Sequence, residues 1–319
     1  MIVTVTPNPA LDRTLEVPDL PRGEVVRATA TRTDLGGKGL NVARALVTTG
    51  HASRVVVPVG GSAGQRLLTA AEQAGLQTVA VPIAADVRTN FSLVEPDGRV
   101  TKINEPGPHL TTGEVAALRA ATRDALTDAT WLATCGSLPP GVPVDSHARL
   151  IDDGHVAGVR VAVDASGPAL VEALAASPDL VKPNVHELAE LVGHPLRCLG
   201  EVADAAAKIV ARGVGAVVAS LGTDGAVLVD RDGRWHATGP DIVVRSAVGA
   251  GDALVAGLLA AGGRGPDALR RGVAYGAGAA ALPGTQFPTS AQLRLDQVQV
   301  YDLDPDRELL ELTEPGGCR

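Results

Sequence analysis

Short β-rich runs alternate with alanine- and leucine-rich segments along most of this 319-residue chain. The β-rich runs fall at residues 2–7, 54–60, 131–136, 159–166, 180–184 and 215–222. Segments with helical periodicity occur between them, at 40–49, 64–74, 112–128 and 203–212. Because parallel neighbours in a sheet need a crossover, usually a helix, this alternation predicts an α/β fold. We expect a doubly wound, mainly parallel sheet flanked by helices.

The composition agrees with a sheet that is buried on both faces. Hydrophobic residues make up 45% of the chain, whereas aromatic residues make up only 2%. The core must therefore consist of Val, Leu, Ile and Ala, as in buried parallel sheets. The length fits one large α/β domain, or one and a half ordinary ones. Ligands of such sheets bind beyond the carboxyl ends of the strands, so we expect the functional residues there.

Two segments interrupt the alternation. Residues 11–33 contain short β-like pieces rich in Thr and Val, without a helical pattern. Residues 88–105 are typical of a hairpin that turns at the sequence PDG. Neither segment has room in the central sheet, so we expect a small accessory β-sheet that covers the strand ends as a lid. Ordinary decorations at the sheet edge are the alternative.

Charge and cysteine content narrow the classes of partner and the compartment. The 28 basic and 36 acidic residues give a net charge of −8, which argues against nucleic-acid and membrane-surface partners. No apolar run reaches about 18 residues, so no membrane span is expected. The first residues lack the pattern of a signal peptide. Cys135, Cys198 and Cys318 are few and scattered, which favours a reducing cytoplasmic setting over a disulfide framework or metal site.

The sequence VGAGD precedes an apolar, alanine-rich segment that is typical of a helix. Backbone N–H groups of Gly249, Ala250 and Gly251 could converge on an anion at the N-terminus of that helix. Asp252 would then sit in the first turn, where its carboxylate could take a proton from a hydroxyl that attacks a phosphoryl group. A simple Asp-capped helix with glycines for packing is the alternative.

The sequence DLGGKGLNVARAL repeats this theme near the N-terminus. Its glycines precede an apolar helix with Asn41 in the first turn, and glycines allow a ligand to approach the backbone closely. Lys38 lies among the glycines without an evident structural task. The spacing matches neither a P-loop nor a convincing dinucleotide fingerprint. A Gly-rich turn of purely structural use is the alternative.

Three further strand ends carry polar residues or glycines. In VKPNVHE, Asn184 and Glu187 share one helix face and could orient water on Mg²⁺, or could simply cap the helix. The sequence SLGTDGA at 220–226 suits nucleotide phosphates. The sequence CGSLPPGV at 135–142 forms a rigid loop in which Ser137 is available for hydrogen bonding.

These five stretches occur in the order that is found in the ribokinase-like (PfkB) carbohydrate kinases. The resemblance extends over residues 1 to about 290, and TPNPALDRTLEV, GGKG and VTKINEPGP make the chain most similar to the phosphosugar-kinase branch. It implies one kinase domain over 1–319, with a lid formed by about 11–33 and 88–105. It also implies ATP-dependent phosphorylation of a ketohexose phosphate in the presence of Mg²⁺. A homodimer formed through the lid is expected.

The resemblance assigns a role to each residue that matches the family's motifs. Asp252 is the catalytic base, and the anion hole consists of Gly249, Ala250 and Gly251. The sugar hydroxyls are bound by Asp12, Gly37 and Asn41, with Ser137 near the substrate. The substrate phosphate is assigned to Lys38, Arg88 and Lys102, and to Arg27 on a lid strand as a weaker fourth. The nucleotide side consists of Lys182, Ser220, Gly222 and Gly225. The residues that tune Mg²⁺ through water are Asn184 and Glu187.

The resemblance implies fructose 1-phosphate as the leading substrate. Basic residues at the substrate edge of an acidic chain also favour a phosphorylated sugar over a neutral one. Tagatose 6-phosphate and fructose 6-phosphate are the alternatives within the same chemistry. A non-catalytic regulator that binds a sugar phosphate on the same fold is the alternative from another class. The presence of Asp252 between these glycines and the helix argues against that regulator.

Overall fold

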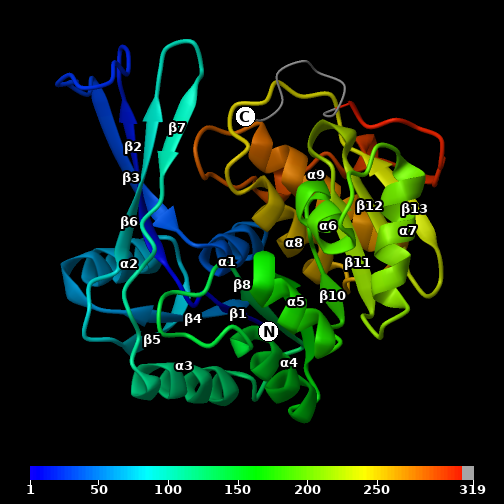
Figure 1. Cartoon of the computed structure of the whole chain (residues 1–319), viewed down its shortest axis with the longest axis horizontal. Coiled ribbons are helices and arrows are strands. Elements are labelled where there is room, and N and C mark those ends of the chain that lie inside the picture. The colour runs from blue at the N-terminus through cyan, green and yellow to red at the C-terminus, as the bar shows by residue number, and fades with distance from the viewer. Residues whose placement is uncertain (311–319) are drawn as a thin grey trace.

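The computed structural model describes residues 1–310, which form a ten-stranded sheet and a separate four-stranded sheet (Figure 1). From one edge to the other, the ten-stranded sheet contains β14 (Gln299–Asp302), β13 (Arg234–Thr238), β12 (Ala226–Asp230), β11 (Ala216–Ser220), β10 (Leu180–Val181), β9 (Arg160–Asp164), β8 (Trp131–Cys135), β1 (Ile2–Val5), β4 (Ser53–Val59) and β5 (Gln77–Pro82). Pairing is parallel from β5 to β11 and antiparallel from β11 to β14. The predicted doubly wound, mainly parallel sheet is confirmed.

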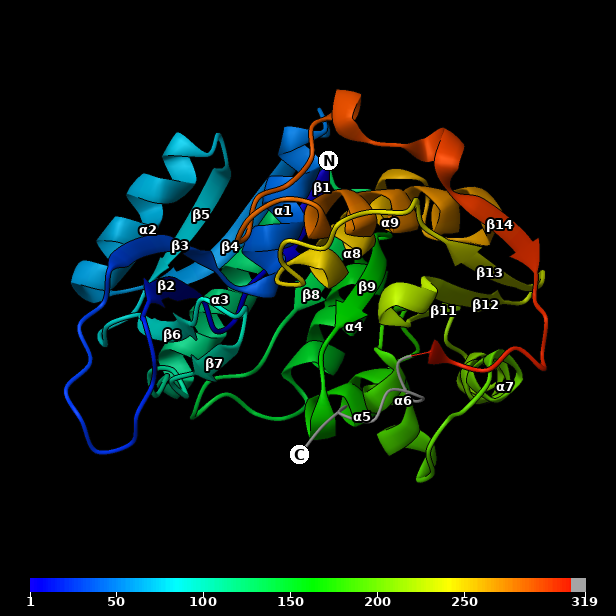
Figure 2. The same cartoon turned by 90° about the horizontal axis from the view of Figure 1, so that it is seen from above.

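Helices cover both faces of this sheet (Figure 2). One face carries α1 (Lys38–Thr48), α2 (Gly61–Gln73), α8 (Ala250–Ala260) and α9 (Gly265–Ala280). The other face carries α3 (Thr112–Ala125), α4 (Ser146–Val156), α5 (Gly167–Ala175), α6 (Val185–Val192) and α7 (Leu199–Val210). The short 3₁₀ turns are η1 (Gly222–Asp224), η2 (Ser290–Gln292) and η3 (Leu295–Gln297). The four helices expected between strands therefore correspond to α1, α2, α3 and α7.

The core consists of aliphatic residues, as the composition required. The strands β1, β8, β9 and β11 present almost continuous buried Val, Leu and Ala to both helical layers. Trp131 and Tyr275 are the largest fully buried side chains among the described residues. A sheet that is apolar on both faces can be stable only when helices cover both, so the patterning alone accounts for the layers.

The four-stranded sheet stands apart from the central sheet, at the upper left of Figure 1. Its order is β3 (Ala30–Gly36), β2 (Ala10–Glu16), β6 (Arg88–Val94) and β7 (Val100–Ile103). The two segments that interrupted the alternation therefore do pair as a separate sheet. One detail of the prediction was wrong. Arg27 is exposed in the connection between β2 and β3 and lies on neither strand, because residues 17–29 leave the sheet at Val17.

The C-terminal segment completes the central sheet, although its sequence indicated no role. β14 adds to the edge strand β13 in antiparallel register, and Val298 is buried against α8 and α9 in the same apolar cluster. Beyond β14, the Asp224 carboxylate accepts hydrogen bonds from the Arg307 guanidinium at 3.2 Å and from the Leu310 backbone N–H at 2.6 Å. The chain end therefore fastens the η1 turn to the body of the protein.

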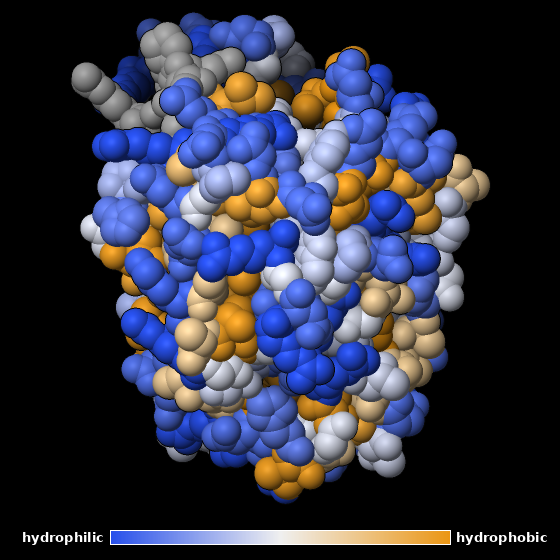
Figure 3. All heavy atoms as spheres, turned by 90° about the vertical axis from the view of Figure 1, so that its right-hand side faces the viewer, coloured by the Kyte–Doolittle hydropathy of each residue, from blue (hydrophilic) through white to orange (hydrophobic). Residues whose placement is uncertain are grey.

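The surface on the side of α7 is predominantly hydrophilic, with apolar residues in separate patches (Figure 3). Among residues 1–310, no helix is both long enough and apolar enough to cross a membrane. Cys135 is buried and Cys198 is half-buried, both as free thiols, while Cys318 lies outside the described residues.

The close packing of α1 on β1 gives the first testable prediction. A Cβ atom at Gly39 would lie 2.6 Å from the Val5 carbonyl oxygen, which is backbone and cannot turn aside. We expect Gly39→Ala to lower the free energy of unfolding by about 1–3 kcal/mol, measured by urea denaturation, because α1 must move away from β1.

Gly113→Ala is the matched control for this substitution. Gly113 also lies in the first turn of a helix, and the nearest atom to its Cβ position is 3.9 Å away. Alanine should therefore stabilise α3 by up to about 1 kcal/mol through helix propensity. Equal losses in the two variants would contradict the packing argument.

Candidate active site

The polar residues gather where the strand order reverses. The chain passes from β1 to β4 and β5 on one side, and returns to β8, β9 and β10 on the other. Such a switch point leaves a crevice beyond the carboxyl ends of the two strands that flank it, here β1 and β8. The N-termini of α1 and α8 adjoin this edge, since these two helices pack against each other and against the sheet.

Asn41 and Asp252 meet across the two helices. Both side chains are buried, and the Asn41 Nδ2 donates a hydrogen bond of 2.9 Å to Asp252 Oδ2. Asn41 lies in the first turn of α1, and Asp252 lies in the first turn of α8. The two Gly-rich motifs, more than 200 residues apart in the sequence, therefore form one site.

The glycine turn before Asp252 has the conformation that an anion hole requires. Gly249 is the N-cap of α8 with φ of 82°, a left-handed value that favours glycine. Ala250 and Gly251 follow as the first helical residues, and the Gly251 N–H has no acceptor within the helix. The Ala250 N–H donates a long hydrogen bond of 3.4 Å to the Ala247 carbonyl oxygen, which a bound anion would replace. With the helix dipole, this turn favours an anion beside Asp252.

Burial is the main cause that raises the pKa of the Asp252 carboxyl, to about 6. The nearby negative charge of Asp164 raises this pKa further, whereas Lys38, the Asn41 hydrogen bond and Lys182 lower it. A carboxylate with a pKa near 6 is largely ionised at neutral pH, yet it is basic enough to accept a proton during a reaction.

The prediction missed Asp164, which is buried at the end of β9 beside this turn. Its Oδ1 lies 2.8 Å from Lys38 Nζ and 3.5 Å from Lys182 Nζ. Burial alone would raise the pKa of the Asp164 carboxyl, but the two ammonium groups hold it below its usual value. An acidic residue at the carboxyl end of a strongly apolar strand was the signal that could have identified it.

The residues predicted for the sugar form a second group at the base of the small sheet. Asp12 Oδ1 accepts a hydrogen bond of 2.9 Å from Asn90 Nδ2, and a Cβ atom at Gly36 would overlap the Asp12 carboxylate. Burial raises the pKa of Asp12, while the positive charges of Arg88 and Lys102 lower it, so both cations lie near this carboxylate. Asn90, on β6 beside Asp12, is a further residue that the prediction missed.

Arg88 and Lys102 differ in how they are held. The Arg88 guanidinium donates hydrogen bonds to the carbonyl oxygens of Asn8, at 3.0 Å, and of Glu105, at 2.8 Å. Lys102 is exposed on β7. The predicted cations therefore do not form one cluster, because Lys38 pairs with Asp164 whereas Arg88 and Lys102 accompany Asp12.

The loop after β8 joins the two groups. Ser137 Oγ accepts a hydrogen bond of 3.1 Å from Asn8 Nδ2, which places Ser137 beside the end of β1. Gly37, the N-cap of α1, has φ of 118°, and a Cβ atom there would lie 2.6 Å from Thr6 Cγ2, so only glycine fits. Arg44, three residues after Asn41 on the same face of α1, donates to Asn41 Oδ1 at 3.4 Å and was also missed.

The residues predicted for the nucleotide lie at the ends of β10 and β11. Ser220 ends β11, and Gly222 and Gly225 bound the η1 turn with φ of 58° and 84°. A Cβ atom at Gly225 would overlap the Ala237 carbonyl oxygen on β13, so this turn packs tightly on the sheet edge. Lys182 Nζ lies 3.6 Å from the Cβ position of Gly251, so it connects this side of the site to the anion hole.

Asn184 and Glu187 form a capping box at the N-terminus of α6. Asn184 Oδ1 accepts a hydrogen bond from the Glu187 backbone N–H, and Glu187 Oε2 accepts one from the Asn184 N–H, both at 2.8 Å. Within residues 1–310, no group of three or more His, Cys, Asp or Glu could hold a metal ion. Mg²⁺ commonly binds one or two carboxylates together with substrate phosphates and water. The second oxygen of Glu187 fits that manner of binding.

Comparison with known proteins agrees with this geometry. Residues 8–292 match the family described as pfkB family carbohydrate kinase. The chain belongs to this family.

Individual relatives and solved structures resemble nearly the whole chain. The chain is 39% identical to a 1-phosphofructokinase of Rhodobacter capsulatus, over 92% of this chain and 94% of the relative. It is 36% identical to the ATP-dependent 6-phosphofructokinase isozyme 2 of Mycobacterium tuberculosis, over 89% and 85%. The tetrameric inhibited form of phosphofructokinase-2 from Escherichia coli superposes with a TM-score of 0.83 at 34% identity, over 89% of this chain and 95% of that one. The carbohydrate-kinase family implied by the five motifs is therefore confirmed.

The raised pKa of Asp252 predicts a gain in stability on removing its charge. Because the folded-state pKa of about 6 exceeds the ordinary value of 3.8, the ionised carboxylate disfavours the folded state above pH 6. We expect Asp252→Asn to raise the free energy of unfolding at pH 8 by up to about 3 kcal/mol. The gain should shrink as the pH falls through 6 towards 4, where the native carboxyl is protonated.

Urea denaturation at several pH values measures this effect, and Asp267→Asn is the control. Asp267 also lies in the first turn of a helix, but its side chain is 92% exposed to water. We expect that control to change stability by less than about 1 kcal/mol. A gain for Asp252→Asn that is the same at pH 8 and pH 4.5 would contradict the assigned pKa.

Proposed function

We propose that this chain transfers the γ-phosphoryl group of ATP to the free 6-hydroxyl of fructose 1-phosphate, giving fructose 1,6-bisphosphate and ADP. The observation that carries the proposal is the buried Asp252 carboxylate at the glycine turn of α8. A base and an anion site in adjacent residues suit proton removal from a hydroxyl as it attacks a phosphoryl group. The 1-phosphofructokinase relative supports fructose 1-phosphate as the acceptor.

In this mechanism Asp252 takes the proton of the attacking hydroxyl, and Asn41 holds the carboxylate in place by its hydrogen bond. The N–H groups of Gly249, Ala250 and Gly251 face the oxygens of the transferring group, where negative charge must be stabilised. Positioning and charge stabilisation contribute most of the catalysis in phosphoryl transfer, and these residues supply both.

The sugar phosphate is proposed to lie at the base of the small sheet. Asp12, Gly37, Asn41 and Ser137 would meet its hydroxyls, with Arg88 and Lys102 near its resident phosphate. The buried Asn90 Oδ1 and Asn8 Oδ1 have no hydrogen-bond partner among residues 1–310, and hydroxyl donors would satisfy both. Arg27, on the connection between β2 and β3, remains a weaker candidate. The small sheet would act as a lid that excludes water.

ATP is proposed to bind at Ser220, Gly222 and Gly225, with Lys182 reaching towards its phosphates. Bound Mg²⁺ would neutralise charge on those phosphates. Asn184 and Glu187 would orient the water molecules around the ion, and their capping box fixes both side chains for this purpose.

Fructose 6-phosphate is the second candidate substrate, because one relative is a 6-phosphofructokinase and its chain is 36% identical. Tagatose 6-phosphate would require the same chemistry. The choice depends on where the resident phosphate meets Arg88 and Lys102. A non-catalytic regulator on the same fold would bind these sugars without turnover.

The test is ADP release by the purified chain with Mg-ATP, comparing kcat/KM for fructose 1-phosphate, fructose 6-phosphate, tagatose 6-phosphate and fructose. We expect fructose 1-phosphate to give the highest value. Asp252→Asn should retain ATP binding but lose about 10²- to 10⁴-fold in kcat, because the base is gone. Asp267→Asn, at the N-terminus of α9, is the matched control and should keep native kcat.

A higher kcat/KM for a 6-phosphate would mean that the resident phosphate binds at a different position than proposed. The mechanism of phosphoryl transfer would remain as proposed. Near-native turnover by Asp252→Asn would remove the proposed base. Sugar-phosphate binding without ADP release in the native chain would favour the regulator.

A homodimer through the small sheet is proposed as the assembly. The edge strand β7 is exposed along its whole length, and Ile103 remains 54% exposed. Exposed edge strands with apolar side chains readily pair with another chain. The phosphofructokinase-2 of Escherichia coli that this chain resembles is described as tetrameric in one structure, which supports self-association of this chain.

Sedimentation velocity tests the assembly with a charge placed on the edge strand. Ile103→Glu should shift the chain towards monomer at micromolar concentration, since burying the carboxylate opposes association. Val156→Glu is the control, because Val156 is equally apolar and 89% exposed at the end of α4. Equal sedimentation of both variants and the native chain would exclude this interface.

A further inference from the structure

Asp164 is the one buried carboxylate of the site to which the proposed reaction gives no task. Its side chain is 1% exposed, and two lysines from distant parts of the chain share its Oδ1 atom. Lys38 comes from the first turn of α1, whereas Lys182 follows β10. Within residues 1–310, the other oxygen, Oδ2, has no hydrogen-bond partner.

The two ammonium groups lie at the glycine turn of α8 and apart from the predicted sugar-phosphate pocket. Lys182 Nζ is 3.6 Å from the Cβ position of Gly251. The charges of Lys38 and Lys182 both act on Asp252, and the charge of Asp252 acts on Lys38. The cations that act on Asp12 are Arg88 and Lys102, and Lys38 is not among them.

We propose that Asp164 is a positioning residue, which holds Lys38 and Lys182 as a pair beside the anion hole so that both ammonium groups face the phosphoryl group during transfer. The proposal rests on the kinase reaction proposed above. It moves Lys38 from the resident phosphate of the sugar to the phosphoryl group that changes bonds.

The charge balance supports this role. The two ammonium groups balance the carboxylates of Asp164 and of ionised Asp252, so no net negative charge opposes an anion at the N–H groups of the turn. A lysine has a long flexible stem, so its charge stabilises a transition state efficiently only when another group fixes it in advance. Asp164 provides that fixation for both lysines from the rigid end of a buried strand.

The same arrangement affects Asp252 in a way that can be measured. The charged groups that act on Asp252 are Asp164 from β9, Lys38 from α1 and Lys182 from the segment after β10. Removing the negative charge of Asp164 must lower the pKa of Asp252, whereas removing the positive charge of Lys38 must raise it. Opposite shifts in the two variants therefore report the arrangement of charges around Asp252, whereas a general loss of stability would not produce them.

Steady-state kinetics with the best sugar phosphate of the native chain is the first arm of the test. We expect Lys38→Met and Asp164→Asn to lower kcat at saturating substrates by about 10- to 10³-fold, because a stabilising charge is lost or released. The KM for the sugar phosphate should change by less than about threefold, because the residues that bind this substrate before the reaction are retained in both variants. A large rise in that KM with native kcat for Lys38→Met would overturn the proposal.

The second arm is a pH titration that needs no substrate. Carboxyl-¹³C aspartate NMR follows Asp252 in the free protein, with its signal identified by its loss in Asp252→Asn. We expect the titration midpoint to fall in Asp164→Asn and to rise in Lys38→Met, each by about half a pH unit or more. Unchanged midpoints in both variants would overturn the proposal.

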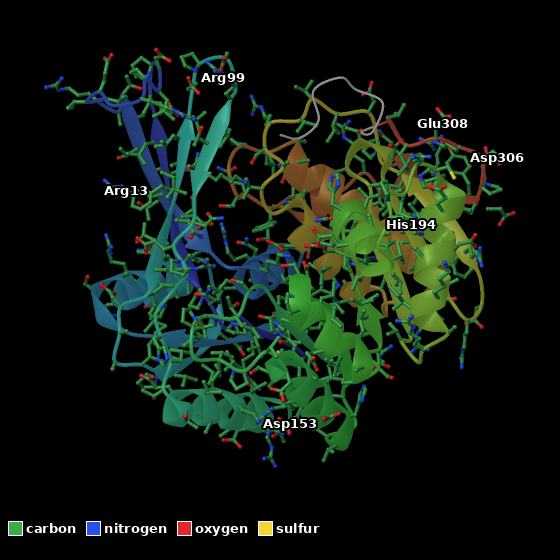
Figure 4. The ribbon with its side chains drawn as sticks, viewed as in Figure 1. Arg13, Arg99, Asp153, His194, Asp306 and Glu308 are labelled. Atoms are coloured by element: carbon green, nitrogen blue, oxygen red, sulfur yellow. The ribbon has the colours of Figure 1, made fainter. Side chains whose placement is uncertain are left out.

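Asp153→Asn is the matched control for both arms. Asp153 is a nearly buried aspartate that binds Arg119 through both oxygens, and it lies on α4 at the far end of the protein from the small sheet (Figure 4). Its substitution breaks a comparable ion pair, yet it should leave kcat and the Asp252 midpoint as in the native chain. Changes equal to those of Asp164→Asn would make the effect a general loss of stability and overturn the proposal.

A folding failure of one variant, or a failure of the proposed kinase function, can be distinguished from a failure of this proposal. Asp164→Asn leaves Lys182 buried without its partner and could fail to fold. Lys38→Met retains the Asp164–Lys182 pair, so its kcat and its upward midpoint shift then decide the proposal alone. If the native chain turns over none of the sugar phosphates, the proposed function fails, and opposite midpoint shifts would still support the arrangement around Asp164.

Discussion

Parallel pairing of β1, β8, β9 and β10 is the constraint on which the site depends. It brings the carboxyl ends of these strands to one edge, where Asp164 ends β9 and Lys182 follows β10. Side chains alternate between the faces of a strand, so a shift of one residue in the β9 register would turn Asp164 towards the opposite helical layer. Val161 and Val163 pack into one apolar layer and the smaller Ala162 packs into the other, so such a shift would exchange large and small side chains between the two layers.

Two buried carboxylates at this edge have opposite electrostatic surroundings. Asp164 lies between ammonium groups that keep its pKa low, whereas Asp252 is buried with an amide partner and has a pKa near 6. Neighbouring titratable groups whose pKa values are pushed apart are suited to different tasks. Asp164 can hold the two ammonium groups in place while Asp252 exchanges a proton, although the two carboxylates are close together.

The C-terminal segment contributes to the same site from outside the family match, which ends at residue 292. Arg307 binds Asp224 at the η1 turn, and the Asp224 carbonyl oxygen contacts His236 Nε2 on β13 at 2.7 Å. The turn that is proposed to meet the nucleotide is therefore held by the edge strands and by the chain end together. Nothing in the local sequence after residue 290 indicated this, because each contact is made to a residue about 70 or more positions away.

The sequence by itself determined the layers of the fold, the small second sheet and the Gly-rich turns, because these follow from local periodicity and from residues with unusual backbone freedom. It also indicated Asp252 and Asn41 as candidate site residues, because their positions beside glycines are informative without a structure. Only the tertiary structure decided which charges meet. Lys38 pairs with Asp164 instead of sharing a phosphate site with Arg88, because strand order brings together residues that no local pattern relates. Electrostatic partners depend on distance in space, and that distance is fixed by the sheet.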